Sequence, residues 1–367
     1  MMFETVFISF SIGLALASVG KYAIYLALLS VLVLFHEFGH FVLAKRFGVT
    51  VTDFALGFGP TLVSTRRGDT TYRINALPLG GYCKMVGEDT ADDGTADPGN
   101  FQRKSIGARF AIIAAGPIFN LILAALIFIF LGAVVGIPTG LTNVVKQVLP
   151  DTPAAAAGLQ PGDEIVQLDG KPVRSGEDMY TYIHGHKGKV IAVDVARGRQ
   201  VLHLHILAKP TQEGGTVVGA FGFRAQDVVE HKPLVDAIFW GVGMVGQTAV
   251  MQVVGIGEAI AHHDTSVIRG PVGIAQIVAS SVQYGLPWLL QLTATLSVVL
   301  GIVNLLPFPA LDGGRLAFLV VELVRGRPVD PEKEGLAHLA GFALLMVFVV
   351  FVTYHDIVQW VQGKGGL

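Results

Sequence analysis

The sequence predicts a polytopic α-helical membrane protein with about four transmembrane helices, a membrane-associated β element and one extracytoplasmic α+β domain. Hydrophobic residues make up 52% of the 367 residues and charged residues only 15%, well below the roughly 25% of a soluble chain. The mean hydropathy is +0.58. The net charge of -2 provides no global basic field, so we expect the lipid bilayer as a partner and no nucleic acid.

Four apolar stretches are long enough to cross a membrane, which requires about 20 residues. They cover residues 22 to about 44, about 110 to 135, about 286 to 306 and about 337 to 360. A fifth stretch, residues 3–19, would make one helix too long for a single crossing if it joined the first span. It is an extra span, an interfacial helix or a half-helix on the outer side. No cleavable signal is expected, because Glu4 stands where a signal peptide is basic.

The chain changes character between the second and third spans. Residues from about 142 to 209 alternate polar and apolar, with turn signals such as Pro161-Gly162-Asp163, and residues 190–196 and 200–207 resemble strands. This pattern predicts a small soluble α+β domain. Residues 234–261 follow, apolar but rich in glycine and interrupted by polar side chains, and favour a helix in the membrane interface over a full span.

Basic residues predict the orientation of the spans, because loops rich in Lys and Arg stay cytoplasmic. They gather in the loops after the first and third spans: Lys45, Arg46, Arg66, Arg67, Arg73, Lys84, Arg103, Lys104 and Arg109, then Arg315, Arg325, Arg327 and Lys333. Both loops should therefore face the cytoplasm and the soluble domain should face outwards.

A metal-binding pattern ends the first span. His36-Glu37-Phe38-Gly39-His40 fits H-E-x-x-H, and on a helix the two histidines share one face, about 6 Å apart along the axis. Two imidazoles can then bind one zinc ion while Glu37 accepts a proton from water. Ionisable groups at membrane depth are costly and usually functional. The alternative is an interfacial helix end with solvated side chains.

A third metal ligand is expected after the third span, in the run Asn304-Leu305-Leu306-Pro307-Phe308-Pro309-Ala310-Leu311-Asp312-Gly313-Gly314. Two prolines break the helix there, and Asp312 is the only carboxylate. Asp312 could instead cap the next helix. Asn304 could donate a hydrogen bond to an oxyanion or to a neighbouring helix. The number of membrane crossings between the two motifs places Asp312 on the cytoplasmic side, as it does His40, provided that residues 234–261 do not cross the membrane.

Other motifs have structural interpretations. Small residues in Ala115-Gly116-Pro117-Ile118-Phe119-Asn120 indicate packing beside the metal helix rather than chemistry. Residues 54–60 and 70–77 resemble short strands that could pair with an extended peptide, or form a plain hairpin. The histidines at 184, 186, 203, 205, 262 and 263 are expected at surfaces, and Cys83 is expected to be reduced and non-catalytic.

Taken together, these motifs resemble the site-2 protease family of intramembrane zinc metalloproteases, most closely its bacterial RseP-type subgroup. The resemblance covers nearly the whole chain. It is carried by the H-E-x-x-H motif, Gly57-Phe58-Gly59, Pro78-Leu79-Gly80-Gly81-Tyr82, Ala115-Gly116-Pro117 with Asn120, Gly270-Pro271-Val272-Gly273-Ile274 and the run from Asn304 to Gly314. The outer domain resembles a PDZ domain through Ala157-Gly158-Leu159-Gln160-Pro161-Gly162-Asp163 and residues 168–173.

The resemblance implies zinc bound by His36, His40 and Asp312, with Glu37 as the catalytic base and Asn304 near the scissile carbonyl. It implies a membrane-reentrant β element that holds substrate, and a location in the bacterial inner membrane. The implied process is regulated intramembrane proteolysis. An upstream site-1 protease first trims a single-span membrane protein, often an anti-sigma factor, and this enzyme cuts the remnant while the PDZ-like domain excludes bulky ectodomains.

Four regions are therefore expected: an N-terminal membrane part at 1–135, a PDZ-like domain at 136–212, a linker with an interfacial helix at 213–285, and a C-terminal membrane part at 286–367. Two features depart from the subgroup: only one PDZ-like domain is visible, where some relatives have two, and the N-terminal extension is longer. Two other functions are weighed. A PDZ adaptor has no need of His36, Glu37, His40 and Asp312, and a metal transporter would need ligands spread along a path.

Overall fold

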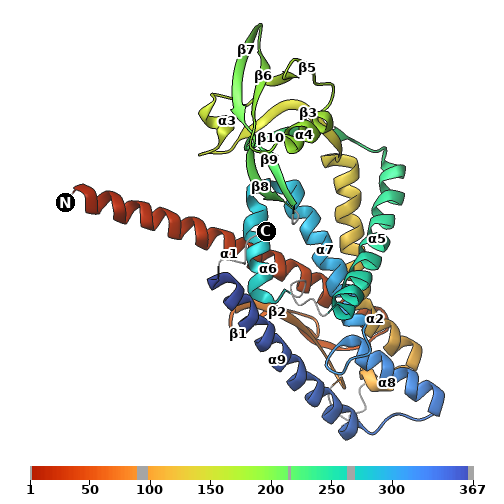
Figure 1. Cartoon of the computed structure of the whole chain (residues 1–367). Helices are drawn as coiled ribbons and strands as arrows, with labels where there is room; N and C mark the ends of the chain where they lie inside the picture. Colours follow the sequence, from red (N-terminus) through yellow and green to blue (C-terminus); the bar gives the residue numbers. More distant parts are fainter. Residues whose placement is uncertain (1, 89–97, 214–215, 263–268, 363–367) are drawn as a thin grey trace. The chain divides into compact units, whose positions relative to one another are not determined.

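The computed structural model describes residues 2–88, 98–213, 216–262 and 269–362, without the side chains of 2–19, 21, 79, 213, 260, 283 and 331. The chain divides into two compact units, Met1–Leu131 with Leu234–Leu367, and Gly132–Pro233 (Figure 1). The first unit contains α1 (Met2–Arg46), β1 (Val51–Arg67), β2 (Thr70–Met85), α2 (Ile106–Phe130), α5 (Leu234–Ala261), α6 (Pro271–Ser281), α7 (Leu286–Leu305), α8 (Asp312–Arg325) and α9 (Pro331–Val361).

Helix α1 joins the first apolar stretch to the first predicted span in one element of 45 residues. At 1.5 Å per residue it is about 68 Å long, more than twice the roughly 30 Å of a hydrocarbon core. Its part with the length and composition of a membrane span is Tyr22–Arg46. The remainder continues the same helix, so the sequence alternatives of a separate span or a separate interfacial helix do not describe its backbone.

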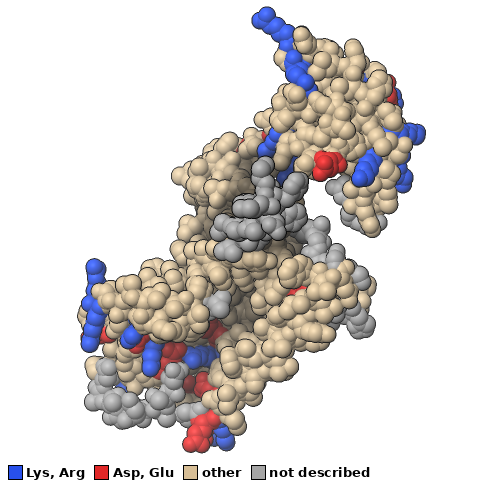
Figure 2. Space-filling view, turned by 90° about the vertical axis from the view of Figure 1, so that its left-hand side faces the viewer, with Lys and Arg blue, Asp and Glu red and all other residues tan. Residues whose placement is uncertain are grey.

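Five helices within the described residues are long and apolar enough to cross a membrane, one more than expected. The addition is α5, which the sequence placed in the interface. It packs along α2 and α7, and its Gly241 approaches the backbone of Ile129 so closely that a Cβ would lie 2.8 Å from the Ile129 nitrogen. The length, composition and packing of α5 are compatible with a span and with a helix in the interface, so the interfacial placement stays a prediction. On the face in Figure 2, the surface of this unit is largely uncharged and its charged side chains gather at one end.

The two-stranded β element lies between α1 and α2 in sequence. Strands β1 and β2 pair antiparallel around a tight turn in which Arg67 opposes Thr70, and they pack on α1. Gly57 has a φ of +82°, and a Cβ there would lie 2.5 Å from the Leu77 carbonyl oxygen, so the two strands can approach only because this residue is glycine. The hairpin tip is open, with Leu62 66% and Val63 63% exposed.

The motif Gly270–Ile274 begins α6. The backbone N–H of Gly273 donates to Oδ2 of Asp356 on α9 at 2.7 Å, and this carboxylate is only 3% exposed. A buried carboxylate is stabilised at a helix N-terminus, where free N–H groups and the helix dipole favour negative charge. Because a Cβ at Gly270 would lie 2.8 Å from the same carboxylate, the small residues of the motif hold α6 against α9.

The second unit is an α+β domain. Its larger sheet has the order β10-β3-β4-β6-β7, with β5 beside β4, and a separate pair joins β8 to β9. The elements are β3 (Ile137–Val148), α3 (Pro153–Ala156), β4 (Glu164–Leu168), β5 (Lys171–Pro172), α4 (Gly176–Gly185), β6 (Val190–Arg197), β7 (Gln200–Leu207), β8 (Lys209–Glu213), β9 (Thr216–Ala220) and β10 (Phe223–Glu230). Strands β6 and β7 confirm the two strands predicted from alternation.

The boundary of this unit differs from the expected 136–212. It runs from Gly132 to Pro233, so the first part of the expected 213–285 linker belongs to the domain. The reason is a long-range pairing: β10 pairs antiparallel with β3, from Phe223 opposite Val148 to Glu230 opposite Ile137. This pairing returns the chain to the place where the domain began.

Candidate active site

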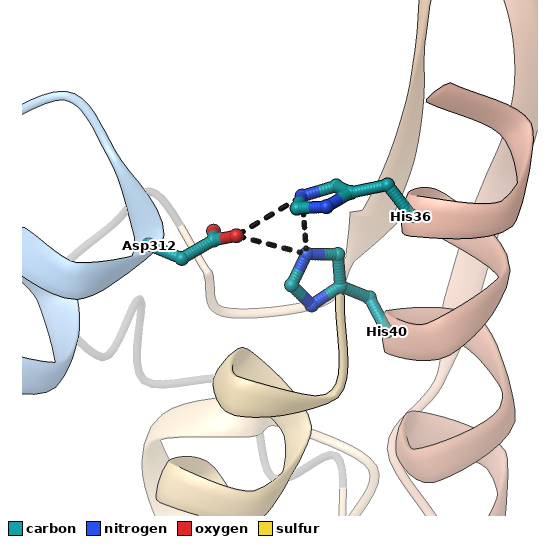
Figure 3. Close-up of side chains that lie close together, drawn as sticks. All are labelled: His36, His40 and Asp312. Atoms are coloured by element: carbon teal, nitrogen blue, oxygen red, sulfur yellow. Dashed lines mark hydrogen bonds and ion pairs between the residues drawn. The ribbon is translucent and has the colours of Figure 1, made fainter. Parts of the chain in front are cut away.

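Three side chains from distant parts of the sequence converge in the helical unit (Figure 3). His36 and His40 lie one turn apart on the same face of α1, with their Nε2 atoms 3.3 Å apart. Asp312 comes from the start of α8, and its Oδ2 lies 3.0 Å from Nε2 of His36 and 3.5 Å from Nε2 of His40. The three ligand atoms lie within 4.8 Å of one another, close enough for one metal ion.

The break after α7 brings Asp312 to this point. The chain leaves the helix at Leu306, and Ala310 adopts a φ of +82° while its N–H donates to Nδ1 of His338 on α9 at 2.8 Å. A Cβ on Gly313 would lie 2.1 Å from the Leu306 carbonyl oxygen, so the tight return needs glycine. Asp312 does not cap α8: the N-cap is Leu311 and no side chain caps the helix.

The hydrogen bonds around the histidines test whether a metal fits. Nδ1 of His40 lies 2.9 Å from the Ile112 carbonyl oxygen, which only accepts, so Nδ1 carries the proton and Nε2 of the neutral ring presents a lone pair. That lone pair faces Oδ2 of Asp312, a buried atom without a well-aligned hydrogen-bond donor among the described residues. A proton or a metal ion between these two atoms would remove their repulsion, and a metal ion there would be held by both. Two imidazoles and one carboxylate form a donor set that zinc uses in catalytic sites.

The ionisation of the Asp312 carboxyl also suits a metal ligand. Burial alone would raise the pKa of its carboxyl, but the adjacent imidazoles of His36 and His40 outweigh burial and hold the pKa below its usual value. Asp312 therefore presents a carboxylate, the form that binds a metal.

A cavity of about 420 Å³ opens beside the three side chains. Glu37 is among its lining residues, and so are Tyr82, Cys83 and Lys84 of β2, with Glu88, Ala310, Leu311 and Arg315. Glu88 and Arg315 form an ion pair across it. Glu37 is thus placed in the same cavity as the ligand cluster. Burial raises the pKa of the Cys83 thiol, which disfavours the reactive thiolate and agrees with the expected non-catalytic role.

Helix α2 supplies the wall behind the histidines. A Cβ on Gly116 would lie 2.3 Å from Nε2 of His40 and 2.9 Å from Cε1 of His36, and one on Gly39 would lie 2.4 Å from the Ala115 carbonyl oxygen. The small residues of this motif therefore do allow close packing, as the sequence indicated. The sequence interpretation missed its last residue: Asn120 is fully buried, and its amide lies 3.1 Å from Nδ1 of His36.

The remaining candidates lie elsewhere. Asn304 is half-buried near the end of α7 and is not among the residues that line the cavity. In the second unit, Nδ1 of His203 lies 2.6 Å from Oδ1 of Asp194 and Nδ1 of His186 lies 2.7 Å from the Tyr182 carbonyl oxygen. Within the described part of the chain, His36, His40 and Asp312 are the one group of donors close enough to share a metal; His263 lies outside that part.

Known proteins are similar to this chain over most of its length. Residues 24–348 match the family described as Peptidase family M50. The chain belongs to peptidase family M50. The zinc metalloprotease RasP of Geobacillus kaustophilus is 30% identical over 91% of this chain and 96% of its own length. The regulator of sigma-W protease RasP of Bacillus subtilis is also 30% identical, over 91% of this chain and 97% of its own.

This M50 peptidase is accordingly a zinc metalloprotease, and its apolar helices and bacterial relatives fit a multi-pass membrane protein. Among solved structures, the PDZ domain of an SdrC-like protein from Listeria monocytogenes aligns with 23% of this chain and 86% of its own, with 27% identity and a TM-score of 0.21.

Proposed function

We propose that this M50 peptidase cuts single-span membrane proteins within or beside the bilayer, using zinc held by His36, His40 and Asp312, with Glu37 as the general base. The observation that supports the site most strongly is the convergence of the Nε2 atoms of two imidazoles and a buried carboxylate oxygen beside a cavity that Glu37 lines. A relative named as a regulator of sigma-W protease supports an anti-sigma factor, already trimmed by a site-1 protease, as the class of substrate.

The proposed chemistry uses groups that line the cavity and one that lies outside it. Zinc, when bound, would supply a Lewis acid that polarises the scissile carbonyl and makes water more acidic. Glu37 would accept the proton of the attacking water and then pass it to the leaving amine nitrogen. Asn304 is proposed to donate a hydrogen bond to the oxyanion of the substrate. Since Asn304 does not line the cavity, this role requires the substrate to extend beyond the cavity towards α7.

The β element is proposed to hold the substrate. A helical substrate must unwind before its amide can be attacked, and an extended segment can add to an exposed strand edge. The open tip with exposed Leu62 and Val63, and the presence of β2 residues in the cavity wall, support this use. The second unit is proposed as a PDZ-like, extracytoplasmic filter against bulky ectodomains, with the active site near the cytoplasmic face of the bacterial inner membrane.

The experiment uses purified full-length protein in detergent and a single-span test substrate. Glu37→Gln should abolish cleavage while one zinc per chain stays bound, and a zinc chelator should abolish cleavage by the unchanged protein. Cleavage that persists in Glu37→Gln would exclude Glu37 as the base. A zinc content well above one ion per chain would favour the transporter alternative. A zinc content that Asp312→Ala leaves unchanged would exclude Asp312 as a ligand.

A further inference from the structure

The amide of Asn120 touches the site without a role in the chemistry proposed above. Asn120 lies on α2, 84 residues from His36 in sequence, and none of its surface is exposed. Its Nδ2 lies 3.1 Å from Nδ1 of His36, while its Oδ1 is buried without a hydrogen-bond partner among the described residues. An orphaned buried amide oxygen is costly, so this side chain is kept for a reason other than packing.

We infer that Asn120 is the positioning residue that makes His36 a zinc ligand, by accepting a hydrogen bond from Nδ1 of its ring; this rests on the proposed zinc site. A neutral imidazole that binds metal through Nε2 must carry its proton on Nδ1. In the arrangement shown, Nδ2 faces that nitrogen. A half-turn of the amide exchanges its oxygen and nitrogen, so that Oδ1 accepts from Nδ1–H.

The same amide can therefore serve two states of His36. When the proton is on Nε2, Nδ2 donates to the lone pair of Nδ1, which is the arrangement seen here. When zinc occupies Nε2, the ring proton would lie on Nδ1 and Oδ1 of the turned amide would accept a hydrogen bond from it. Asparagine offers both a donor and an acceptor at one position. His40 has no such choice, because its Nδ1 faces the Ile112 carbonyl oxygen, which only accepts.

The backbone around Asn120 is held in place from the opposite helix. Oγ of Ser297 on α7 donates to the carbonyl oxygen of Asn120 at 2.7 Å, and Ser297 is fully buried. This bond ties α2 to the helix that leads to Asp312. This contact holds the backbone at Asn120, from which the amide reaches His36.

The test measures zinc affinity of full-length protein in detergent by competition with a chelator, for Asn120→Leu, Asn120→Asp and Asn75→Leu. Asn120→Leu keeps the size and removes the acceptor, so its zinc affinity should fall by about 10–100-fold, the usual effect of losing a partner that orients a ligand. Asn120→Asp keeps an acceptor and should bind zinc as tightly as the unchanged protein or more tightly. Asn75 is another buried amide of the same unit, bonded to the Gly57 carbonyl oxygen, and Asn75→Leu should keep normal zinc affinity.

A second readout is the visible absorption of the Co²⁺-loaded proteins, which reports ligand geometry. It should change in Asn120→Leu and be retained in Asn120→Asp. The inference is overturned if Asn120→Leu binds zinc normally, if Asn120→Asp loses as much affinity as Asn120→Leu, or if Asn75→Leu loses as much as either. Failure of the unchanged protein to bind zinc, or normal binding by His36→Ala, would instead refute the metal site itself.

Discussion

Gly116 of α2 lies against the imidazole of His40, so closely that a Cβ on Gly116 would stand 2.3 Å from Nε2. Gly116→Ala should therefore displace the ring and lower zinc affinity by on the order of 10–100-fold, the range for changes that disturb ligand orientation. Zinc titration against a chelator measures this. Gly107→Ala is the matched control in the same helix, since nothing lies within 4 Å of a Cβ there. Equal affinity in both variants would contradict the packing argument.

A variant at Asn304 can distinguish an effect on zinc binding from an effect on peptide-bond cleavage. If its amide stabilises the oxyanion, Asn304→Ala should lower kcat by roughly 100-fold and leave zinc affinity unchanged, because Asn304 does not line the metal cavity. Cleavage of a single-span substrate at saturating concentration gives kcat, and chelator competition gives the zinc affinity. An unchanged kcat would assign Asn304 to helix packing instead.

Arg109 of α2 and Glu322 of α8 form a buried ion pair, with side chains 8% and 13% exposed. Removing one partner leaves a buried charge unpaired, so Arg109→Met should destabilise the protein by about 3–5 kcal/mol. The double variant Arg109→Met with Glu322→Met should lose less. Thermal unfolding in detergent compares the three proteins. Equal destabilisation in the single and double variants would contradict the argument that an unpaired buried charge causes the loss.

The carboxyl of Asp163 should make the stability of the second unit depend on pH. Burial alone would raise the pKa of its carboxyl, but hydrogen bonds from the Arg197 side chain and the Gln160 N–H outweigh burial and lower it. A lowered folded pKa contributes stability that is present above the unfolded pKa of about 3.9 and is lost as the pH falls through the folded value.

Arg197→Met should therefore lower the melting temperature at pH 7, and the difference from the unchanged protein should shrink as the pH drops below about 4. The exposed Arg199 offers the control Arg199→Met. A difference between the two proteins that stays constant from pH 7 to pH 3 would mean that the Asp163 carboxylate is not the group responsible.

Patterns of short range were readable from the sequence. The H-E-x-x-H spacing needs only a helix to place His36 and His40 on one face, and the strands at 190–197 and 200–207 follow from alternation of neighbouring residues. Asp312 was the candidate third metal ligand because it is the only carboxylate in the run after the third span. The shared face of the two histidines and the two strands depend on local geometry, which repeats every 3.6 residues in a helix and every two in a strand.

Relationships of long range required the tertiary structure. The contact between Asn120 and His36 spans 84 residues, and only the approach of α2 to α1 through Gly39 and Gly116 creates it. Likewise, β10 extends the second unit to Pro233 by pairing with β3, and the packing of α5 along α2 joins segments about 100 residues apart. Side-chain spacing along one element determines which residues share a face, whereas the packing of whole elements decides what that face meets.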